Sequence, residues 1–507
     1  MIEVVPYSID QLKRLLIASS GASPFVIQTK TQTAYFKDYF QAVGAKTILV
    51  EQPYTDRDFL EDFAGYYVRC FHDYRRTCAR LHFFTCDFTH DKFCECLSAQ
   101  STAVTCEQLQ EAYLGFIVVK PLPETVIGRT CLKTYPDDNK RRHFPSTRTY
   151  AANLFGIPLQ TESLAFQEQD TVAAACATSA LWTVFQGTGK LFQHRIPSPI
   201  EITKTASTHW MTETRDLPNS GLTADQMAFV IRSLELEPFV VNAKEMHILR
   251  ATIYAYLRGH IPPLLGMSLH DFTSGHPSFR NRGRHAVAVT GFSMGLTNVS
   301  GIAPSGLLLR SSRMDKIYVH DDQVGPFSRM ELRADHLTTS WPDTAGNIGN
   351  VRAIPELLLI PLYHKIRIPL KAVLDILADF DSFIEELRKY ETTLLPARIE
   401  WDVFLTGVND FRAEIRLAPE LNVACRCALA QRSLPKYLWR ATALSNGQKV
   451  ADLIFDATDI EQADLAAMAV PYDKVFADVM KNLSTNAALS TFLPDHRVRS
   501  IVSSFAK

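Results

Sequence analysis

A single apolar helix with a cysteine at its start constrains this chain more than any other stretch. Small and apolar residues follow Cys176 at helical spacing, with Ala180 and Val184 at successive fourth positions. The pattern predicts a helix that starts near residue 173 and ends at Gly187. Because one broad face of this helix is apolar, we expect that face to lie in a core.

The position of Cys176 favours a reactive thiol. Unpaired N–H groups and the positive end of the helix dipole lie at a helix N-terminus, and both stabilise a thiolate. The small residues at 173–177 would let a substrate reach the sulfur. The alternative is a structural thiol, because free cysteine is among the residue types most often buried. The helix alone leaves both interpretations open.

Two downstream strands offer the partners that a catalytic cysteine needs. The run AVAVTGF follows His285 and predicts a core strand with this histidine at its entrance, and a second strand, IYVHDD, ends at Asp321 and Asp322. An imidazole can take the thiol proton, and a carboxylate can orient the imidazole. Because consecutive strand residues face opposite sides, only one of the two carboxylates is expected to do so. Three rival histidines begin no clean strand: His260, His270 and His276.

The motifs ACATSALW, RHAVAVTGF and IYVHDD, in this order, resemble the papain-like cysteine peptidases, and within them the bacterial branch that includes double-glycine leader peptidases. The resemblance covers about residues 150–345. It implies an α+β fold in which the cysteine helix meets a sheet. It also implies Cys176 as nucleophile, His285 as general base and acid, and Asp321 as the residue that orients His285. Asp321 is preferred to Asp322 on this resemblance alone.

Two positions depart from the family pattern. The family usually has an oxyanion-hole glutamine six residues before the cysteine, where this chain has Asp170. The nearest candidate for that role is Gln169, and Gln167 is the second. The glycine that commonly follows the nucleophile is replaced by Ala177.

Trp182 and Arg284 are the residues expected to contact the substrate. Trp182 supplies an aromatic ring on the cysteine helix, and Arg284 ends a long loop with several arginines. A basic rim at a cleft would favour an acidic substrate segment, or the loop would close over the substrate. The alternative is an ordinary solvated loop.

Length, charge and cysteine usage bound the rest. A chain of 507 residues predicts roughly two to four domains, and a formal net charge of −1 argues against a nucleic-acid surface. The start lacks a signal-peptide pattern, and no apolar run is long enough to span a bilayer. We predict a cytoplasmic protein that binds neither nucleic acid nor membrane. Because no export signal is found, we expect reduced thiols. The ten cysteines lack paired zinc-knuckle spacing, so we expect no metal, and we expect no cofactor.

The predicted organisation has three parts. Residues 1–149 form a mixed α/β accessory domain, residues 150–345 the papain-like domain, and residues 346–507 an α+β accessory domain that holds substrate, a partner protein or the N-terminal region. In the first part SPFVIQ and KTILVEQ predict strands, and DRDFLEDFAGYYVRCF predicts a helix capped by Thr55 or Asp56. The helix AKEMHILRATIYAYLRG is placed in the central part. In the last part Asn446-Gly447 predicts a hairpin turn.

These patterns predict a cysteine peptidase that hydrolyses a peptide or amide bond through a thioester intermediate. Its partner is a protein or peptide substrate. A deamidase or transamidase would use the same three residues. A protein-binding scaffold that keeps the fold without catalysis is the alternative from another class, and the departures at Asp170 and Ala177 favour it.

Overall fold

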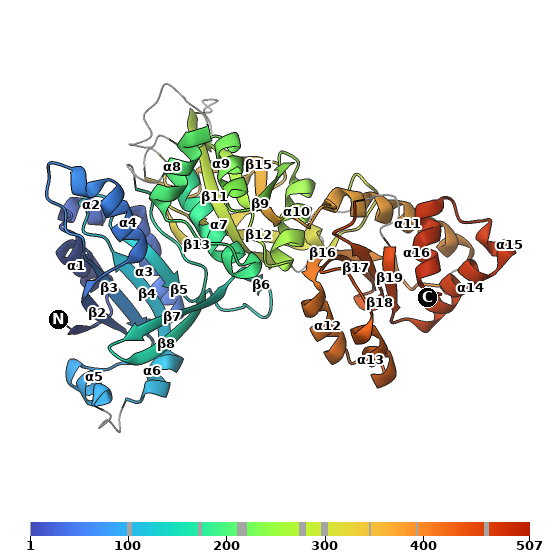
Figure 1. Cartoon of the computed structure of the whole chain (residues 1–507), viewed down its shortest axis with the longest axis horizontal. Helices are drawn as coiled ribbons and strands as arrows, with labels where there is room; N and C mark the ends of the chain where they lie inside the picture. Colours follow the sequence, from blue (N-terminus) through green and yellow to red (C-terminus); the bar gives the residue numbers. More distant parts are fainter. Residues whose placement is uncertain are drawn as a thin grey trace. The chain divides into compact units, whose positions relative to one another are not determined.

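The computed structural model describes residues 2–98, 104–170, 175–209, 221–272, 280–295, 303–343, 346–391, 394–460 and 466–506 (Figure 1). The chain divides into two compact units, each with helices and strands. It is therefore a multidomain α+β protein. The first unit comprises Met1–Lys244, His260–Ser293 and Lys316–Pro361, and the second comprises Glu245–Gly259, Met294–Asp315 and Leu362–Lys507.

The borders of these units differ from the predicted domain borders. The predicted accessory region 1–149 shares a unit with most of the central region, and no border falls near residue 150. The helix predicted at 243–259 is α10 (Met246–Arg258), and it belongs to the second unit rather than to the central region. Within that unit the Tyr254 hydroxyl donates to Asp402 Oδ1 at 2.8 Å.

A five-stranded antiparallel sheet forms one layer of the first unit. Its order is β1-β2-β3-β4-β5, so every strand pairs with its neighbour in sequence. The inner strands β3 and β4 are buried along their whole length, as their apolar residues predict. The strands are β1 (Ile2–Pro6), β2 (Thr47–Tyr54), β3 (Cys78–Phe84), β4 (Tyr113–Val119) and β5 (Ile127–Leu132). The helices of this region are α1 (Ile9–Ser20), α2 (Pro24–Thr29), α3 (Thr31–Val43), α4 (Arg57–Gly65), η1 (Tyr67–Arg69), α5 (His90–Leu97) and α6 (Cys106–Ala112).

Capping side chains set where helices of this region begin. The predicted cap Asp56 accepts from the Phe59 N–H at 3.0 Å and starts α4. The predicted strand SPFVIQ is wrong, since these residues form α2. Ser23 Oγ accepts from the Val26 N–H at 3.3 Å and Pro24 lies in the first turn, and both features favour a helix start.

An eight-stranded sheet carries the candidate site. Its order is β13-β12-β11-β10-β15-β14, with β6 beside β11 and β9 beside β15. Gly266 of β10 lies between Ala286 of β11 and Leu357 of β15. The strands are β6 (Arg142–His143), β9 (Leu236–Asn242), β10 (Leu264–Asp271), β11 (Arg280–Met294), β12 (Met314–Asp321), β13 (Gly325–Glu331), β14 (Leu337–Thr338) and β15 (Val351–Tyr363).

Helices α7 (Cys176–Phe192) and α9 (Ala224–Ser233) share one core with this sheet. The apolar helix predicted after Cys176 is thus confirmed. Helix α8 (Pro199–His209) packs against α7 and α9, and β7 (Arg148–Leu154) pairs with β8 (Ile157–Ser163) in a separate hairpin. The shared core includes Ala180, Leu181, Val184, Val230, Ile231, Leu264, Ala288 and Leu359.

The second unit is built on a four-stranded antiparallel sheet in the order β16-β17-β18-β19. Asn446 and Gly447 have φ values of 49° and 76°, which confirms the predicted hairpin turn. The strands are β16 (Glu400–Gly407), β17 (Tyr437–Ser445), β18 (Gln448–Asp456) and β19 (Ala466–Pro471). Besides α10, the helices are η2 (Arg310–Arg313), α11 (Leu370–Tyr390), α12 (Val408–Leu417), α13 (Val423–Gln431), α14 (Lys474–Thr485), α15 (Ala487–Ser490) and α16 (His496–Ser504).

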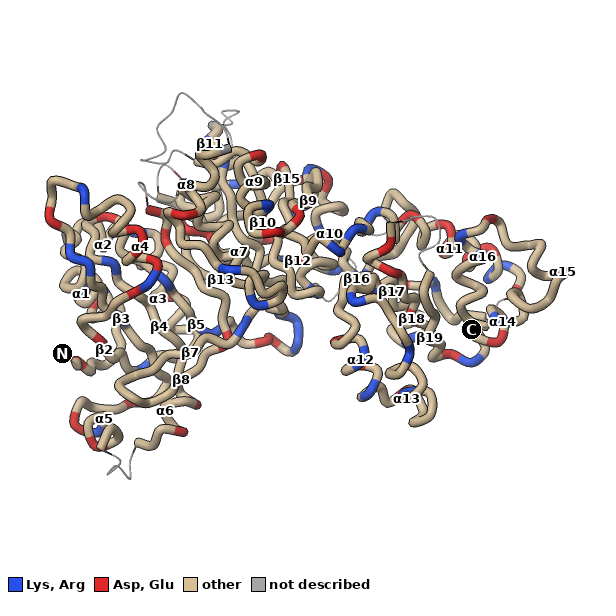
Figure 2. Tube along the Cα trace, viewed as in Figure 1, with Lys and Arg blue, Asp and Glu red and all other residues tan. Residues whose placement is uncertain are grey.

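Basic and acidic residues are interspersed along both units (Figure 2). This mixture agrees with the formal net charge of −1. Among the described helices, none combines the length and the apolar character that crossing a bilayer requires.

Candidate functional site

Cys176 is the first residue of α7 and is partly exposed. The preceding Ala175 has an extended backbone (φ −81°, ψ 176°), and no described side chain caps this helix. The Ser179 N–H donates to the Ala175 carbonyl at 3.0 Å and closes the first turn. The N–H groups before Ser179 have no partner within the helix. The thiol therefore lies beside backbone donors.

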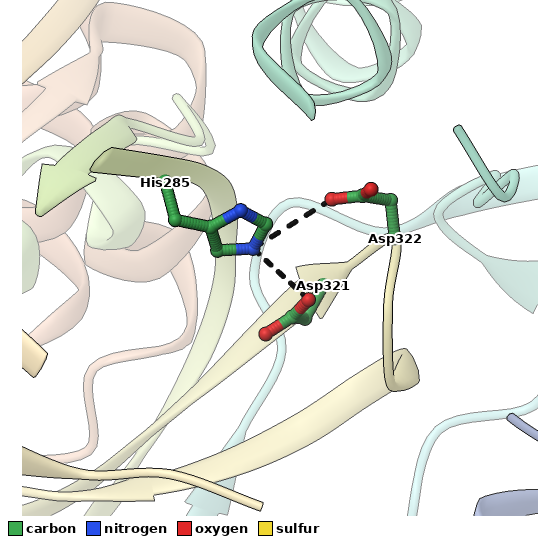
Figure 3. Close-up of side chains that lie close together, drawn as sticks. All are labelled: His285, Asp321 and Asp322. Atoms are coloured by element: carbon green, nitrogen blue, oxygen red, sulfur yellow. Dashed lines mark hydrogen bonds and ion pairs between the residues drawn. The ribbon is translucent and has the colours of Figure 1, made fainter. Parts of the chain in front are cut away.

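His285 lies inside β11 rather than at its entrance, because the polar residues before it also pair with β10. Its Nε2 atom is 3.1 Å from Asp321 Oδ1, and both side chains are buried. Figure 3 shows Nε2 turned towards the carboxylates, with the other ring nitrogen facing away from them. Cys176 and His285 line the same cavity, and an interaction with the Cys176 side chain is among the causes that raise the pKa of His285. Because Nε2 faces the carboxylates, Nδ1 is the atom left for the thiol.

Two opposing effects set the charge of His285. Burial lowers the pKa of an imidazole because it disfavours the charged form. The charge of Asp321, the hydrogen bonds to Asp321 and Cys176, and the charge of Asp322 outweigh burial and raise the pKa of His285 well above its ordinary value. At neutral pH the ring is therefore expected to be a cation, which favours a thiolate beside it.

Asp322 also faces His285, so the expectation that only one carboxylate would do so is wrong. β12 ends at Asp321, and Asp322 begins the turn to β13, where strand alternation no longer applies. Asp322 Oδ1 lies 3.6 Å from His285 Nε2, against 3.1 Å for Asp321 Oδ1. Burial raises the pKa of Asp322 to about 7, the charge of Asp321 acts in the same direction, and His285 opposes both. Asp321 makes the shorter contact.

Trp341 completes the surroundings of Asp321. Its Nε1–H donates to Asp321 Oδ2 at 2.7 Å, and its ring meets the imidazole of His285 edge-on, with centroids 5.0 Å apart and planes at 71°. The Gln323 N–H donates to Asp321 Oδ1 at 3.1 Å. Three donors thus converge on this carboxylate. The sequence analysis missed Trp341, which lies between β14 and β15 in a loop without periodicity.

A cavity of about 440 Å³ opens beside Cys176 and His285. Most of its wall is apolar or small, and an ion pair lies among its lining residues, where Arg284 Nε approaches Glu356 Oε2 at 3.2 Å. The Arg284 side chain is 86% exposed. Arg284 lines the cavity and its charge is paired with Glu356, and its predicted contact with a substrate stays a prediction. The remaining lining residues are Ala177, Gly221, Leu222, Thr223, Ala224, Met227, Gly266, Met267, Ala286 and Leu357.

Trp182 does not lie at this cavity. It is fully buried, and its Nε1–H donates to Asp58 Oδ2 at 3.0 Å. Six residues beyond Cys176, it is rotated by roughly 240° around the helix from the cysteine. The predicted contact of Trp182 with substrate is therefore corrected to a packing role.

The oxyanion candidates before Cys176 are not brought to the cavity either. Gln169 is half-buried and does not line it. Asp170, at the position of the family glutamine, is buried and accepts from the Tyr67 hydroxyl. Gln167 is buried, and its Nε2 has no hydrogen-bond partner among the described residues. The predicted role of Gln169 stays a prediction.

Neither rival histidine in the described residues joins this site. The imidazole of His260 contacts the Pro145 carbonyl at 2.6 Å, and that of His270 contacts Ser268 Oγ at 3.1 Å. His276 lies outside the described residues.

One group of described residues could hold a metal ion. Ligand atoms of His285, Asp321 and Asp322 lie within 4.8 Å of one another. Both carboxylate oxygens of Asp321 already accept hydrogen bonds, from His285 and the Gln323 N–H at Oδ1 and from Trp341 at Oδ2. A metal would therefore compete with the arrangement that charges His285.

Neither a search of protein-family models nor a search of curated proteins finds a match for this chain. The resemblance to papain-like peptidases therefore depends on the residues and geometry described above.

Proposed function

We propose that this protein is a papain-like cysteine peptidase that hydrolyses a peptide or amide bond. The observation that carries the proposal is the buried hydrogen bond between His285 and Asp321 at a cavity that Cys176 and His285 both line. These three residues come from a helix, a strand and a strand end that are far apart in sequence. A cysteine with only a structural role does not require a buried histidine beside it whose pKa two carboxylates raise.

The proposed reaction begins with the Cys176 thiolate and the His285 imidazolium. The sulfur attacks the substrate carbonyl carbon, and N–H groups at the start of α7 donate to the oxyanion. When the C–N bond breaks, His285 gives its proton to the leaving amine. His285 then takes a proton from water, which attacks the thioester. The carboxylic acid leaves and the thiolate returns.

The cavity beside Cys176 favours a substrate with an apolar side chain near the scissile carbonyl. Leu222, Met227 and Leu357 line it together with Gly266. A Cβ atom at Gly266 would lie 3.2 Å from Leu357 Cγ. A side chain at Gly266 would therefore press on the Leu357 side chain in the cavity wall.

Gly266→Val is expected to change the size of substrate that is accepted. The added methyl groups would occupy the cavity, so kcat/KM for peptides with leucine at the selected position should fall by about tenfold to a hundredfold. Peptides with alanine there should be affected much less. Peptide-library profiling of both proteins measures this, and an equal loss for both side chains would contradict the assignment of the cavity.

Product analysis tests the reaction class. The natural protein and Cys176→Ala would be incubated with a complex peptide mixture, and the products analysed by mass spectrometry. New peptide termini that need Cys176 support a peptidase, whereas Cys176-dependent conversion of glutamine to glutamate, or of glutamine to a new amide, identifies a deamidase or a transamidase. Identical product sets from both proteins would contradict catalysis and favour a scaffold.

A further inference from the structure

The start of α3 contacts both chain segments that hold the proposed catalytic groups. One segment, residues 164–170, leads to Cys176. The other, residues 322–326, is the turn after Asp321. Both lie in the same unit as α3, although more than a hundred residues separate them from it in sequence.

The contacts with the turn are made by Gln32 and Tyr35. Gln32 is buried, and its Nε2 donates to the Asp322 carbonyl at 2.7 Å. The Tyr35 hydroxyl donates to the Pro326 carbonyl. The ring of Tyr35 covers Gly325, where a Cβ atom would lie only 2.4 Å from Tyr35 Cδ1. The backbone of the turn is therefore fixed at both ends by one helix.

The contact with the segment before Cys176 is made by Lys30, the residue that precedes α3. Its ammonium group pairs with Glu168 Oε1, and the two side chains are 12% and 5% exposed. Glu168 Oε2 accepts from the Ile127 N–H at 3.0 Å. A buried pair of this kind holds its partners firmly, because separating them would leave an unpaired buried charge.

We propose that the start of α3 braces the proposed active site, with Gln32 as a positioning residue for the turn that follows Asp321 and begins with Asp322. The inference rests on the proposed function, because it concerns the orientation of His285. The carboxylates of Asp321, directly before this turn, and of Asp322, its first residue, lie 3.1 and 3.6 Å from His285 Nε2. A small displacement of the Asp322 backbone would therefore weaken the pairing of His285 with Cys176.

Contacts of His320 hold β12 to the segment before Cys176 and to β13, and they do not involve Gln32. His320 Nε2 donates to the Leu164 carbonyl at 2.9 Å, and its Nδ1 accepts from the Phe327 N–H at 3.1 Å. Burial lowers the pKa of His320 to about 4, so the ring stays neutral as this arrangement needs. Loss of the Gln32 contact should therefore shift the turn without releasing the strand.

The test compares Gln32→Met with Gln41→Met. Methionine keeps the length of glutamine but removes the donor, and Gln41 is an exposed glutamine on the same helix. The measured quantities are the rate of Cys176 alkylation by iodoacetamide as a function of pH, followed by mass spectrometry, and the melting temperature. We expect Gln32→Met to slow alkylation below neutral pH by about tenfold. Gln41→Met should match the natural protein.

A second variant, Tyr35→Phe, keeps the ring on Gly325 and removes only the hydroxyl, so it serves if Gln32→Met does not fold. It should slow alkylation in the same pH range by a smaller factor. An alkylation profile that superimposes on that of the natural protein, for a folded variant, would overturn the brace even if the melting temperature falls. If the natural protein and His285→Ala had the same profile, the proposed function itself would fail, so the two failures are distinguishable.

Discussion

Cys176→Ala is expected to lower hydrolysis by roughly a thousandfold or more, because the variant has no atom that can form the thioester. The fold should persist. Cys176 is partly exposed at the start of α7, and alanine suits a helix. Initial rates on a cleaved peptide and the melting temperature measure both parts of the expectation.

Cys425→Ala is the matched control for this variant. Cys425 is also a partly exposed cysteine on a helix, but it lies in the second unit. The control should keep full activity. Full activity of Cys176→Ala would rule out the nucleophile, whereas loss of activity in both variants would indicate a general sensitivity to cysteine replacement.

Asp321→Asn is expected to lower kcat by about a hundredfold or more, because the carboxylate orients the imidazole and stabilises its charged form. The carboxylate accepts from His285, Trp341 and the Gln323 N–H, whereas an amide offers only one acceptor oxygen. Loss of the negative charge also removes an effect that raises the pKa of His285. The imidazolium would then lose its proton at lower pH, so the alkaline limb of the pH–rate profile should move to lower pH.

Asp322→Asn is the comparison that separates the two carboxylates. Asp322 makes the longer contact with His285, and burial already raises its pKa to about 7. We therefore expect a smaller loss of kcat and a smaller movement of the alkaline limb. If Asp322→Asn had the larger effect on both quantities, the roles of the two residues would be reversed.

Local sequence signals predicted the elements that carry the site. The apolar spacing after Cys176 predicted α7, because burial of one helix face leaves a periodic pattern, and the Val-rich run after His285 predicted a core strand, because burial of both strand faces leaves a continuous apolar run. The Asn446-Gly447 turn was predicted for a similar reason, since few residues adopt positive φ.

Contacts between segments that are far apart in sequence leave no local pattern from which they could be predicted. Asp322 faces His285 because β12 ends one residue earlier, and strand ends are poorly specified by pattern. Trp341 reaches Asp321 from an irregular loop, and Gln32 reaches the Asp322 carbonyl from a helix near the start of the chain. The prediction of a strand at SPFVIQ was wrong because the capping residue Ser23 and Pro24 in the first turn favour a helix start, although the segment is apolar enough for a strand.

The most direct test of the central claim is the pH dependence of Cys176 alkylation in the natural protein and in His285→Ala. The account predicts that Cys176 in the natural protein reacts rapidly below neutral pH, and that the reaction slows strongly when the imidazolium is removed. Other exposed cysteines, such as Cys94, should react equally in both proteins. A Cys176 that is inert, or that reacts identically in both proteins, would contradict the thiolate–imidazolium pair and with it the proposed peptidase.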